Sequence, residues 1–215
     1  MIDTITQTLS NLPTNLIINL TYIASALLFF IGLKKLSSAK TARFGNFLSA
    51  SGMLVASIIT LIDKNIVSFE WILIGLAIGS VIGILSARLV ALTAMPEMVA
   101  LLNGFGGISS LLLGCAAYYT TSYHPLFTII TIMLSIIIGG LTFSGSIIAW
   151  AKLSQKLPGK PLTLPLHHII NILILCGIFI SSIAVCTLDF ADGFFYLAIG
   201  LSLLLGVLSV ISIGG

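Results

Sequence analysis

The chain has 215 residues, of which 58% are hydrophobic and 7% charged, and its mean hydropathy is +1.22. Ordinary soluble domains carry about a quarter charged residues, so this composition excludes one and predicts an integral membrane protein. The net charge of +3 gives no reason to expect a nucleic-acid partner, because the basic residues lie between apolar runs. The three cysteines lie within those runs without C-x-x-C spacing, which favours buried apolar residues over metal ligands or disulfides.

Apolar runs of about twenty residues recur along the chain, and each is long enough to cross the hydrocarbon layer of a membrane. We therefore expect an all-α fold, a polytopic transmembrane helical bundle with about seven spans. Residues 1–15 read as a polar N-terminal lead without the basic region of a secretory signal, and residues 16–215 as the transmembrane helical domain. The expected spans are 16–33, 44–62, 71–87, 96–119, 126–150, 167–188 and 194–213.

The third expected span carries glycines at a spacing that suits helix packing. Gly75, Gly79 and Gly83 recur every four residues, which places them on one face of a helix. Small residues on one face let the backbone of another helix approach closely in a membrane. We predict a packing role for these glycines and no chemistry.

The fourth expected span combines a helix start with an intramembrane amide. Pro96 suits the first turn of a helix, and the Glu97 carboxylate suits the positive end of its dipole. Asn103 follows at a depth where lipid offers no hydrogen bonds, so its amide needs a polar partner or water. Close packing against another helix is expected at the glycines that come next, Gly104, Gly106 and Gly107.

The distribution of basic residues predicts the orientation. Eight of the nine follow the odd-numbered spans, namely Lys34, Lys35, Lys40, Arg43, Arg88, Lys152, Lys156 and Lys160. Only Lys64 lies on the other side. The positive-inside rule then places the N-terminus outside and Gly215 on the cytoplasmic side. We expect Lys152, Lys156 and Lys160 in a loop after the fifth span.

Motifs of soluble catalytic sites are not found in the sequence. It has no Walker A pattern, no H-E-x-x-H and no G-x-S-x-G. The glycines at 104, 106 and 107 invite comparison with a dinucleotide-binding turn. They lie in the middle of a span, without the preceding strand or the acidic residue about twenty positions later, so we reject a nucleotide site there.

Three stretches together resemble the membrane domain of the beta subunit of proton-translocating NAD(P) transhydrogenase. They read M-P-E-M-V-A-L-L-N-G-F-G-G at 95–107, T-F-S-G-S-I-I-A-W-A-K-L at 142–153, and K-P-L-T-L-P-L-H-H-I-I-N at 160–171. Their order and spacing are those of the family. The resemblance covers nearly the whole chain from the first span to Gly215, and the orientation derived from charge agrees with it.

The resemblance implies an enzyme that passes a hydride between NAD(H) and NADP(H), coupled to proton movement through the membrane domain. In the family NAD(H) binds the alpha subunit and NADP(H) a soluble C-terminal domain of the beta subunit, so no cofactor is expected in this chain. The implied partners are the alpha subunit, the remaining C-terminal part of the beta subunit and membrane lipid, in a dimer of the complex in the cell inner (plasma) membrane. The family continues beyond the position of Gly215, so we expect a truncation there.

The resemblance also suggests roles for three residues in a proton pathway. Asn103 falls where many relatives have a histidine proposed to transfer protons, while others have asparagine and place the histidine on a membrane helix of the partner subunit. An amide does not titrate near neutral pH, so Asn103 could hold water or orient a relay. Ser146 matches a serine facing the same path, and Glu97 matches a carboxylate that could gate access at the cytoplasmic end.

Structural explanations stand beside these roles. Asn103 could make only a helix-to-helix hydrogen bond, Ser146 could pack or bond to the preceding turn, and Glu97 could complement a helix N-terminus. For the whole chain, the alternative is a transporter-like or structural membrane bundle, or a nonfunctional remnant, without hydride chemistry.

For the three histidines we expect positions that face the membrane surface, lipid or water rather than a role in a proton relay. His167 and His168 lie at the mouth of a span, where an interfacial or lipid-facing position is expected. His124, in the turn before the fifth span, is expected to meet water.

Overall fold

The computed structural model describes residues 2–62, 69–120, 125–162, 166–188 and 192–213. Every regular element in these residues is a helix, which confirms the predicted all-α fold. The elements are α1 (Ile2–Leu36), α2 (Ala42–Ile62), α3 (Phe69–Leu89), the short 3-10 helix η1 (Leu92–Ala94), α4 (Met95–Thr120), α5 (Leu126–Leu153), α6 (His167–Thr187) and α7 (Asp192–Ile211).

Seven helices in the described part of the chain are long and apolar enough to cross a membrane. An α-helix rises 1.5 Å per residue, so about 20 residues span the hydrocarbon layer of roughly 30 Å. The predicted spans are thereby confirmed, and the chain is a multi-pass membrane protein. The backbone of residues 2–15 continues α1 toward the N-terminus, while the candidate span within α1 is Leu16–Leu36.

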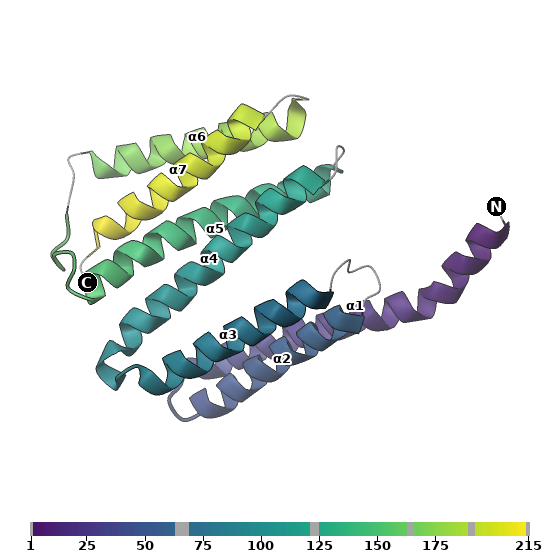
Figure 1. Ribbon diagram of the computed structural model, residues 1–215. Coiled ribbons are helices and arrows are strands. Elements are labelled where there is room, and N and C mark those ends of the chain that lie inside the picture. The colour runs from purple at the N-terminus through teal and green to yellow at the C-terminus, as the bar shows by residue number, and fades with distance from the viewer. Residues whose placement is uncertain (1, 63–68, 121–124, 163–165, 189–191, 214–215) are drawn as a thin grey trace. The chain divides into compact units, whose positions relative to one another are not determined.

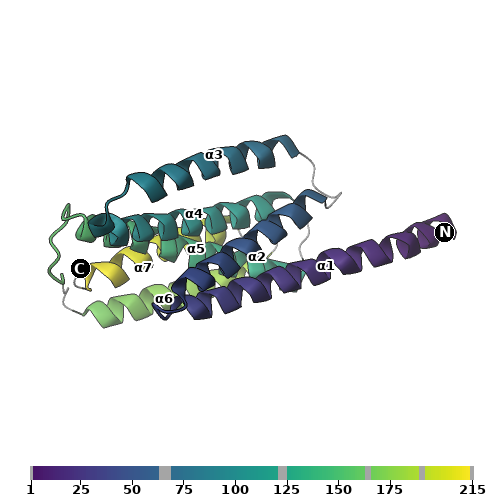
Figure 2. The same ribbon diagram turned by 90° about the horizontal axis from the view of Figure 1, so that it is seen from below.

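The chain forms two compact units, residues 1–83 and 84–215. In the first, α1 and α2 lie side by side as an antiparallel pair (Figure 2). A Cβ at Gly45 would lie 2.7 Å from the carbonyl oxygen of Gly32, so the two backbones touch. Further along the pair, the hydroxyls of Tyr22 and Thr60 are 2.9 Å apart. Close packing and a hydrogen bond thus join these two helices.

Helix α3 has no buried residue. A Cβ added at Gly75, Gly79 or Gly83 would meet nothing within 4 Å in the structure described. Nothing among the described residues therefore packs on these glycines, and the helix-packing role predicted for them stays a prediction.

In the second unit α5 lies between α4 and α7, and α6 packs mainly on α7 (Figure 1). The apolar core of this unit includes Met133 and Ile136 of α5 and Phe195 and Ala198 of α7, with Val185 of α6 against them. Ile136 and Phe195 are fully buried. Because α5 lies in the middle of the unit, its contacts with α4 on one side and with α7 on the other hold the unit together.

Helix α5 extends to Leu153, three residues beyond the predicted end at Trp150. Lys152 therefore lies in the last helical turn, and its side chain is buried with 5% exposure. The prediction that Lys152 belongs to a basic loop was wrong. The reason is physical: α7 supplies carbonyl oxygens that satisfy the ammonium group, whereas Lys156 and Lys160 do follow in the loop.

Candidate functional site

The contact between α4 and α5 is a glycine seam. Gly104, Gly107 and Gly114 are buried on α4 at a spacing that keeps them on one face of the helix. A Cβ at Gly107 would lie 2.6 Å from the backbone nitrogen of Phe143, and a Cβ at Gly139 would lie 2.6 Å from that of Leu111. No side chain fits at such distances, so the two backbones pack directly against each other.

Gly106 does not belong to this seam. It is exposed, and a Cβ there would meet nothing within 4 Å in the structure described. Three glycines in four residues cannot all share one face of a helix, because successive residues are turned by about 100°. The structure thus separates Gly104 and Gly107, which lie in the seam, from Gly106, which lies outside it.

Asn103 and Ser146 meet across the seam. The Nδ2 of Asn103 donates a hydrogen bond of 2.9 Å to the Oγ of Ser146. Ser146 is buried with 7% exposure, whereas Asn103 is exposed. Gly104 permits the meeting, since a Cβ there would already lie 3.2 Å from the Cβ of Ser146. The amide therefore has a polar neighbour within an apolar span, as its cost in lipid requires.

The pair keeps unused hydrogen-bonding capacity after this contact. An amide also carries a carbonyl oxygen that accepts, and a hydroxyl that accepts one bond still has its own proton to donate. Asn103 and Ser146 together thus still offer both donors and acceptors besides their mutual bond. A water molecule needs both kinds of partner, so the pair has the chemistry of a hydration site.

Glu97 lies in the first turn of α4 and is half-buried. It precedes Asn103 by six residues, about 9 Å along the helix axis, so it is not part of the Asn103–Ser146 contact. Its position is also the one where a carboxylate stabilises a helix N-terminus. The predicted gating role of Glu97 stays a prediction.

A second polar pair joins the same two helices. The hydroxyls of Ser110 and Ser135 are 2.9 Å apart, and the hydroxyl of Ser135 donates to the backbone carbonyl of Ser110 at 2.8 Å. These serines were not predicted from the sequence. Ser110 follows Asn103 by seven residues, two helical turns, and this spacing was the available signal because it puts both on one face of α4.

His167 and Asn171 form a polar pair in the first turns of α6. The Nδ2 of Asn171 lies 3.2 Å from the Nε2 of His167. His167 is half-buried, while His168 is exposed. His124 lies outside the described residues. The interfacial or lipid-facing position expected for His167 and His168 stays a prediction.

Aromatic residues gather at the opposite end of the unit, where α4 ends and α7 begins. Tyr118 stacks on Phe195 with ring centroids 3.9 Å apart, and its hydroxyl donates to Asp192 at 3.0 Å. The hydroxyl of Tyr119 donates to that of Tyr196 at 2.8 Å. Tyrosines that combine an apolar ring with a hydrogen-bonding tip are typical of the membrane surface.

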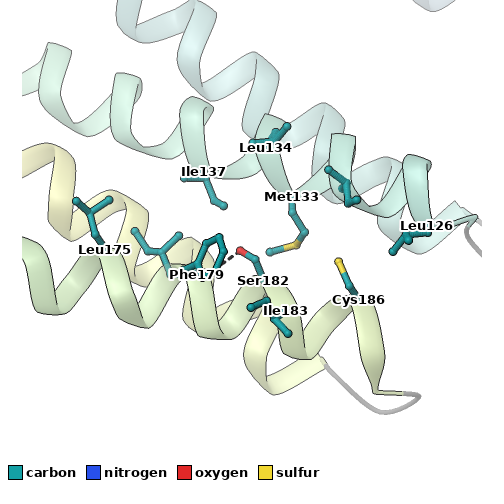
Figure 3. Close-up of a pocket in the computed structure, with 11 residues that line it drawn as sticks. Leu126, Met133, Leu134, Ile137, Leu175, Phe179, Ser182, Ile183 and Cys186 are labelled. Carbon is teal, nitrogen blue, oxygen red and sulfur yellow. Dashed lines mark hydrogen bonds between the residues drawn. The ribbon is translucent and has the colours of Figure 1, made fainter.

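A cavity of about 530 Å³ lies between α5 and α6 (Figure 3). It is lined by Leu126, Ile130, Met133, Leu134, Ile137, Leu175, Ile178, Phe179, Ser182, Ile183 and Cys186. The hydroxyl of Ser182 donates to the carbonyl of Ile178 in its own helix at 2.7 Å. These described lining residues include no acid, base or amide, so the cavity is a poor place for proton chemistry.

Comparison with known proteins shows which family the sequence of this chain matches. The sequence pattern of the NAD(P) transhydrogenase beta subunit matches residues 18–215. The NAD(P) transhydrogenase subunit beta of Rhodospirillum rubrum is 32% identical over 155 residues, which cover 68% of this chain and 33% of the relative. A second sequence of that name from a defined strain of the species matches equally. The chain spans about a third of the length of these curated relatives. It belongs to the NAD(P) transhydrogenase beta subunit family.

Proposed function

We propose that this chain is the proton-translocating membrane part of an NAD(P) transhydrogenase, and that Asn103 and Ser146 hold water on its proton path. The observation that carries the proposal is the 2.9 Å hydrogen bond between the two side chains across the α4–α5 seam. Family membership supports it, because the relatives are named as beta subunits of that enzyme. Intramembrane polar groups are costly, which favours a functional reason for keeping them.

The chemistry of the pair limits what it does. Neither an amide nor a hydroxyl takes up a proton near neutral pH, so Asn103 and Ser146 orient water without storing the proton. In this proposal the proton moves through water bound between the Asn103 carbonyl oxygen and the Ser146 hydroxyl. The titrating group lies on a membrane helix of the partner subunit, as the family resemblance implies, and Glu97 controls access at the cytoplasmic end.

The remaining parts of the enzyme lie outside this chain in the same proposal. NAD(H) binds the alpha subunit and NADP(H) binds a soluble domain of the beta subunit. Hydride transfer between them is coupled to proton movement through the helices described here. The charge distribution supports a cytoplasmic position for the C-terminal ends of α1, α3 and α5. In the same proposal the complex is a dimer in the cell inner membrane.

The test is the substitution Asn103→Leu in the assembled enzyme. Leucine keeps a side chain of similar size but removes both the donor and the acceptor, so water loses its partner. We expect the rate of proton-coupled transhydrogenation to fall by about tenfold, which is less than the roughly 100-fold lower end of what a positioned proton-transferring group contributes. Nucleotide binding to the soluble domains, measured by titration, should not change.

A matched control is Ser109→Ala on the same helix. Ser109 is exposed, and its hydroxyl donates to the carbonyl of Phe105 in its own helix at 2.8 Å. This variant should keep the coupled rate. Normal coupled activity in the Asn103→Leu enzyme would remove Asn103 from the mechanism. An unsubstituted chain that supports no coupled activity with its partners would instead favour a structural bundle without hydride chemistry.

A further inference from the structure

Lys152 is a buried lysine that ends one membrane helix and holds the end of another. Its side chain is 5% exposed. The ammonium donates to the backbone carbonyl oxygens of Ile211 at 2.7 Å and Val210 at 3.3 Å, and also to that of Ile213. An ammonium has three protons to donate, so these three acceptors use all of them.

The carbonyl end of α7 compensates the buried charge. The last four carbonyl groups of an α-helix have no partner within the helix, and together they carry about half a negative charge. A buried ammonium without such partners would be strongly unfavourable. The loop after α5 adds a second attachment, because the backbone nitrogen of Leu162 donates to the carbonyl of Ile211 at 3.1 Å. The end of α5 and the end of α7 are therefore tied together.

Packing between α5 and α7 is tight just before this tie. A Cβ at Gly206 of α7 would lie 3.0 Å from the backbone nitrogen of Gly145, and a Cβ at Gly145 would lie 3.1 Å from the Cγ2 of Val210. The same stretch of α5 carries Ser146, six residues before Lys152 and about 9 Å away along the axis. One side of this stretch thus packs on α7, while Ser146 meets Asn103 of α4.

We infer that Lys152 is a positioning residue for Ser146: by holding the last turns of α5 on α7, it sets where the Ser146 hydroxyl lies relative to α4. A pair of heavy atoms about 3.6 Å apart no longer forms a hydrogen bond, and the bond also weakens steeply at angles below about 120°, so a small tilt of α5 breaks the Asn103–Ser146 contact. The functional part of this inference rests on the proposed proton path. The structural part, the tie between α5 and α7, does not.

Amide hydrogen exchange of the full chain in detergent tests the tie. Lys152→Met removes the three donors at similar side-chain length, and we expect amides in the last turn of α7 to exchange about tenfold faster or more. Lys152→Arg keeps the charge and donors and should remain within about threefold of the unsubstituted chain. Lys156→Met is the matched control, because the Lys156 ammonium lies 4.1 Å over the Trp150 ring without touching α7 carbonyls.

Unchanged exchange in Lys152→Met would overturn the tie. If that variant does not fold, Lys152→Gln replaces it, since a neutral amide keeps some donors and should give intermediate exchange. Exchange of the Gln variant equal to that of the unsubstituted chain would overturn the tie as well.

A double-substitution experiment in the assembled enzyme tests the positioning role. If Lys152 acts through Ser146, Lys152→Met lowers the proton-coupled rate, and adding it to Ser146→Ala lowers that rate by no more than about twofold further. Losses that multiply, or a Lys152→Met enzyme with the normal coupled rate, would overturn the positioning role. A Ser146→Ala enzyme with the normal coupled rate would instead overturn the proposed function, while hydrogen exchange still decides the tie.

Discussion

Helix α5 meets its neighbours in two different ways. Toward α4 and α7 it presents glycines and hydroxyl groups beside the apolar core around Met133 and Ile136, and backbone packs on backbone at Gly107, Gly139 and Gly206. Toward α6 it presents large apolar side chains, and a cavity of about 530 Å³ lies between the two helices. All three neighbours are apolar membrane helices, so overall hydropathy does not explain the difference.

The difference shows that close packing between helices determines where the polar side-chain pairs lie in this protein. Lipid is as apolar as leucine, so helices gain little by burying leucines against each other, and close contact depends on small residues and interhelical hydrogen bonds. The polar pairs Asn103–Ser146 and Ser110–Ser135 both lie along the glycine seam. The α5–α6 side has no glycine among its described lining residues, and Ser182 there bonds only within its own helix.

The largest expected effect breaks the seam itself. In Gly107→Leu the new side chain would begin 2.6 Å from the backbone nitrogen of Phe143, and backbone cannot yield as a flexible side chain can. We expect the substitution to lower the free energy of unfolding in detergent by about 3 kcal/mol, the upper part of the range for overpacking. Denaturant or thermal unfolding followed by circular dichroism measures it.

Gly106→Leu is the matched control, one residue away on the same helix. A Cβ at Gly106 meets nothing within 4 Å in the structure described, so we expect a change below about 0.5 kcal/mol. Equal losses in the two variants would contradict the role of the seam, because leucine has a higher helix propensity than glycine at both positions and only the contact with α5 distinguishes them.

Sequence and structure agree where the relevant property is local. Hydropathy was sufficient to find the seven spans, because each span is a continuous apolar run. Gly106 could have been separated from Gly104 and Gly107 by helical periodicity alone. The resemblance predicts that Asn103 and Ser146 share one path, and the structure brings their side chains into direct contact; the path itself stays a prediction.

Other features depend on contacts between distant segments. Lys152 looked like one more basic residue after a span, because its three carbonyl partners lie about sixty positions later in the chain. For α3 the sequence predicts a glycine packing face, and a Cβ at Gly75, Gly79 or Gly83 would meet none of the described residues within 4 Å. A regular spacing of small residues indicates that a helix can be approached closely and does not identify the partner.

A smaller effect is expected at the Asn103–Ser146 hydrogen bond. The single variants Asn103→Leu and Ser146→Ala and the double variant form a cycle that isolates the interaction energy of the pair. We expect about 0.6 kcal/mol, and less than about 1.7 kcal/mol, as for other hydrogen bonds between membrane helices. Unfolding of the four proteins in detergent measures it. An interaction energy of zero would show that the contact adds nothing to stability. Hydration would then be the reason for the pair.

The smallest effect is expected on the α6 side of α5. Cys186 of α6 lines the cavity, so the larger side chain in Cys186→Leu has room and should change the free energy of unfolding by less than about 0.5 kcal/mol. Gly139→Ala tests the tightly packed α4 side of α5 for comparison. It adds a single methyl group, but that group would lie 2.6 Å from the backbone nitrogen of Leu111, and we expect a loss of about 1 to 3 kcal/mol. If Cys186→Leu proved as costly as Gly139→Ala, the α5–α6 side would be as tightly packed as the seam, and close contact would no longer distinguish the side of α5 that carries the polar pairs.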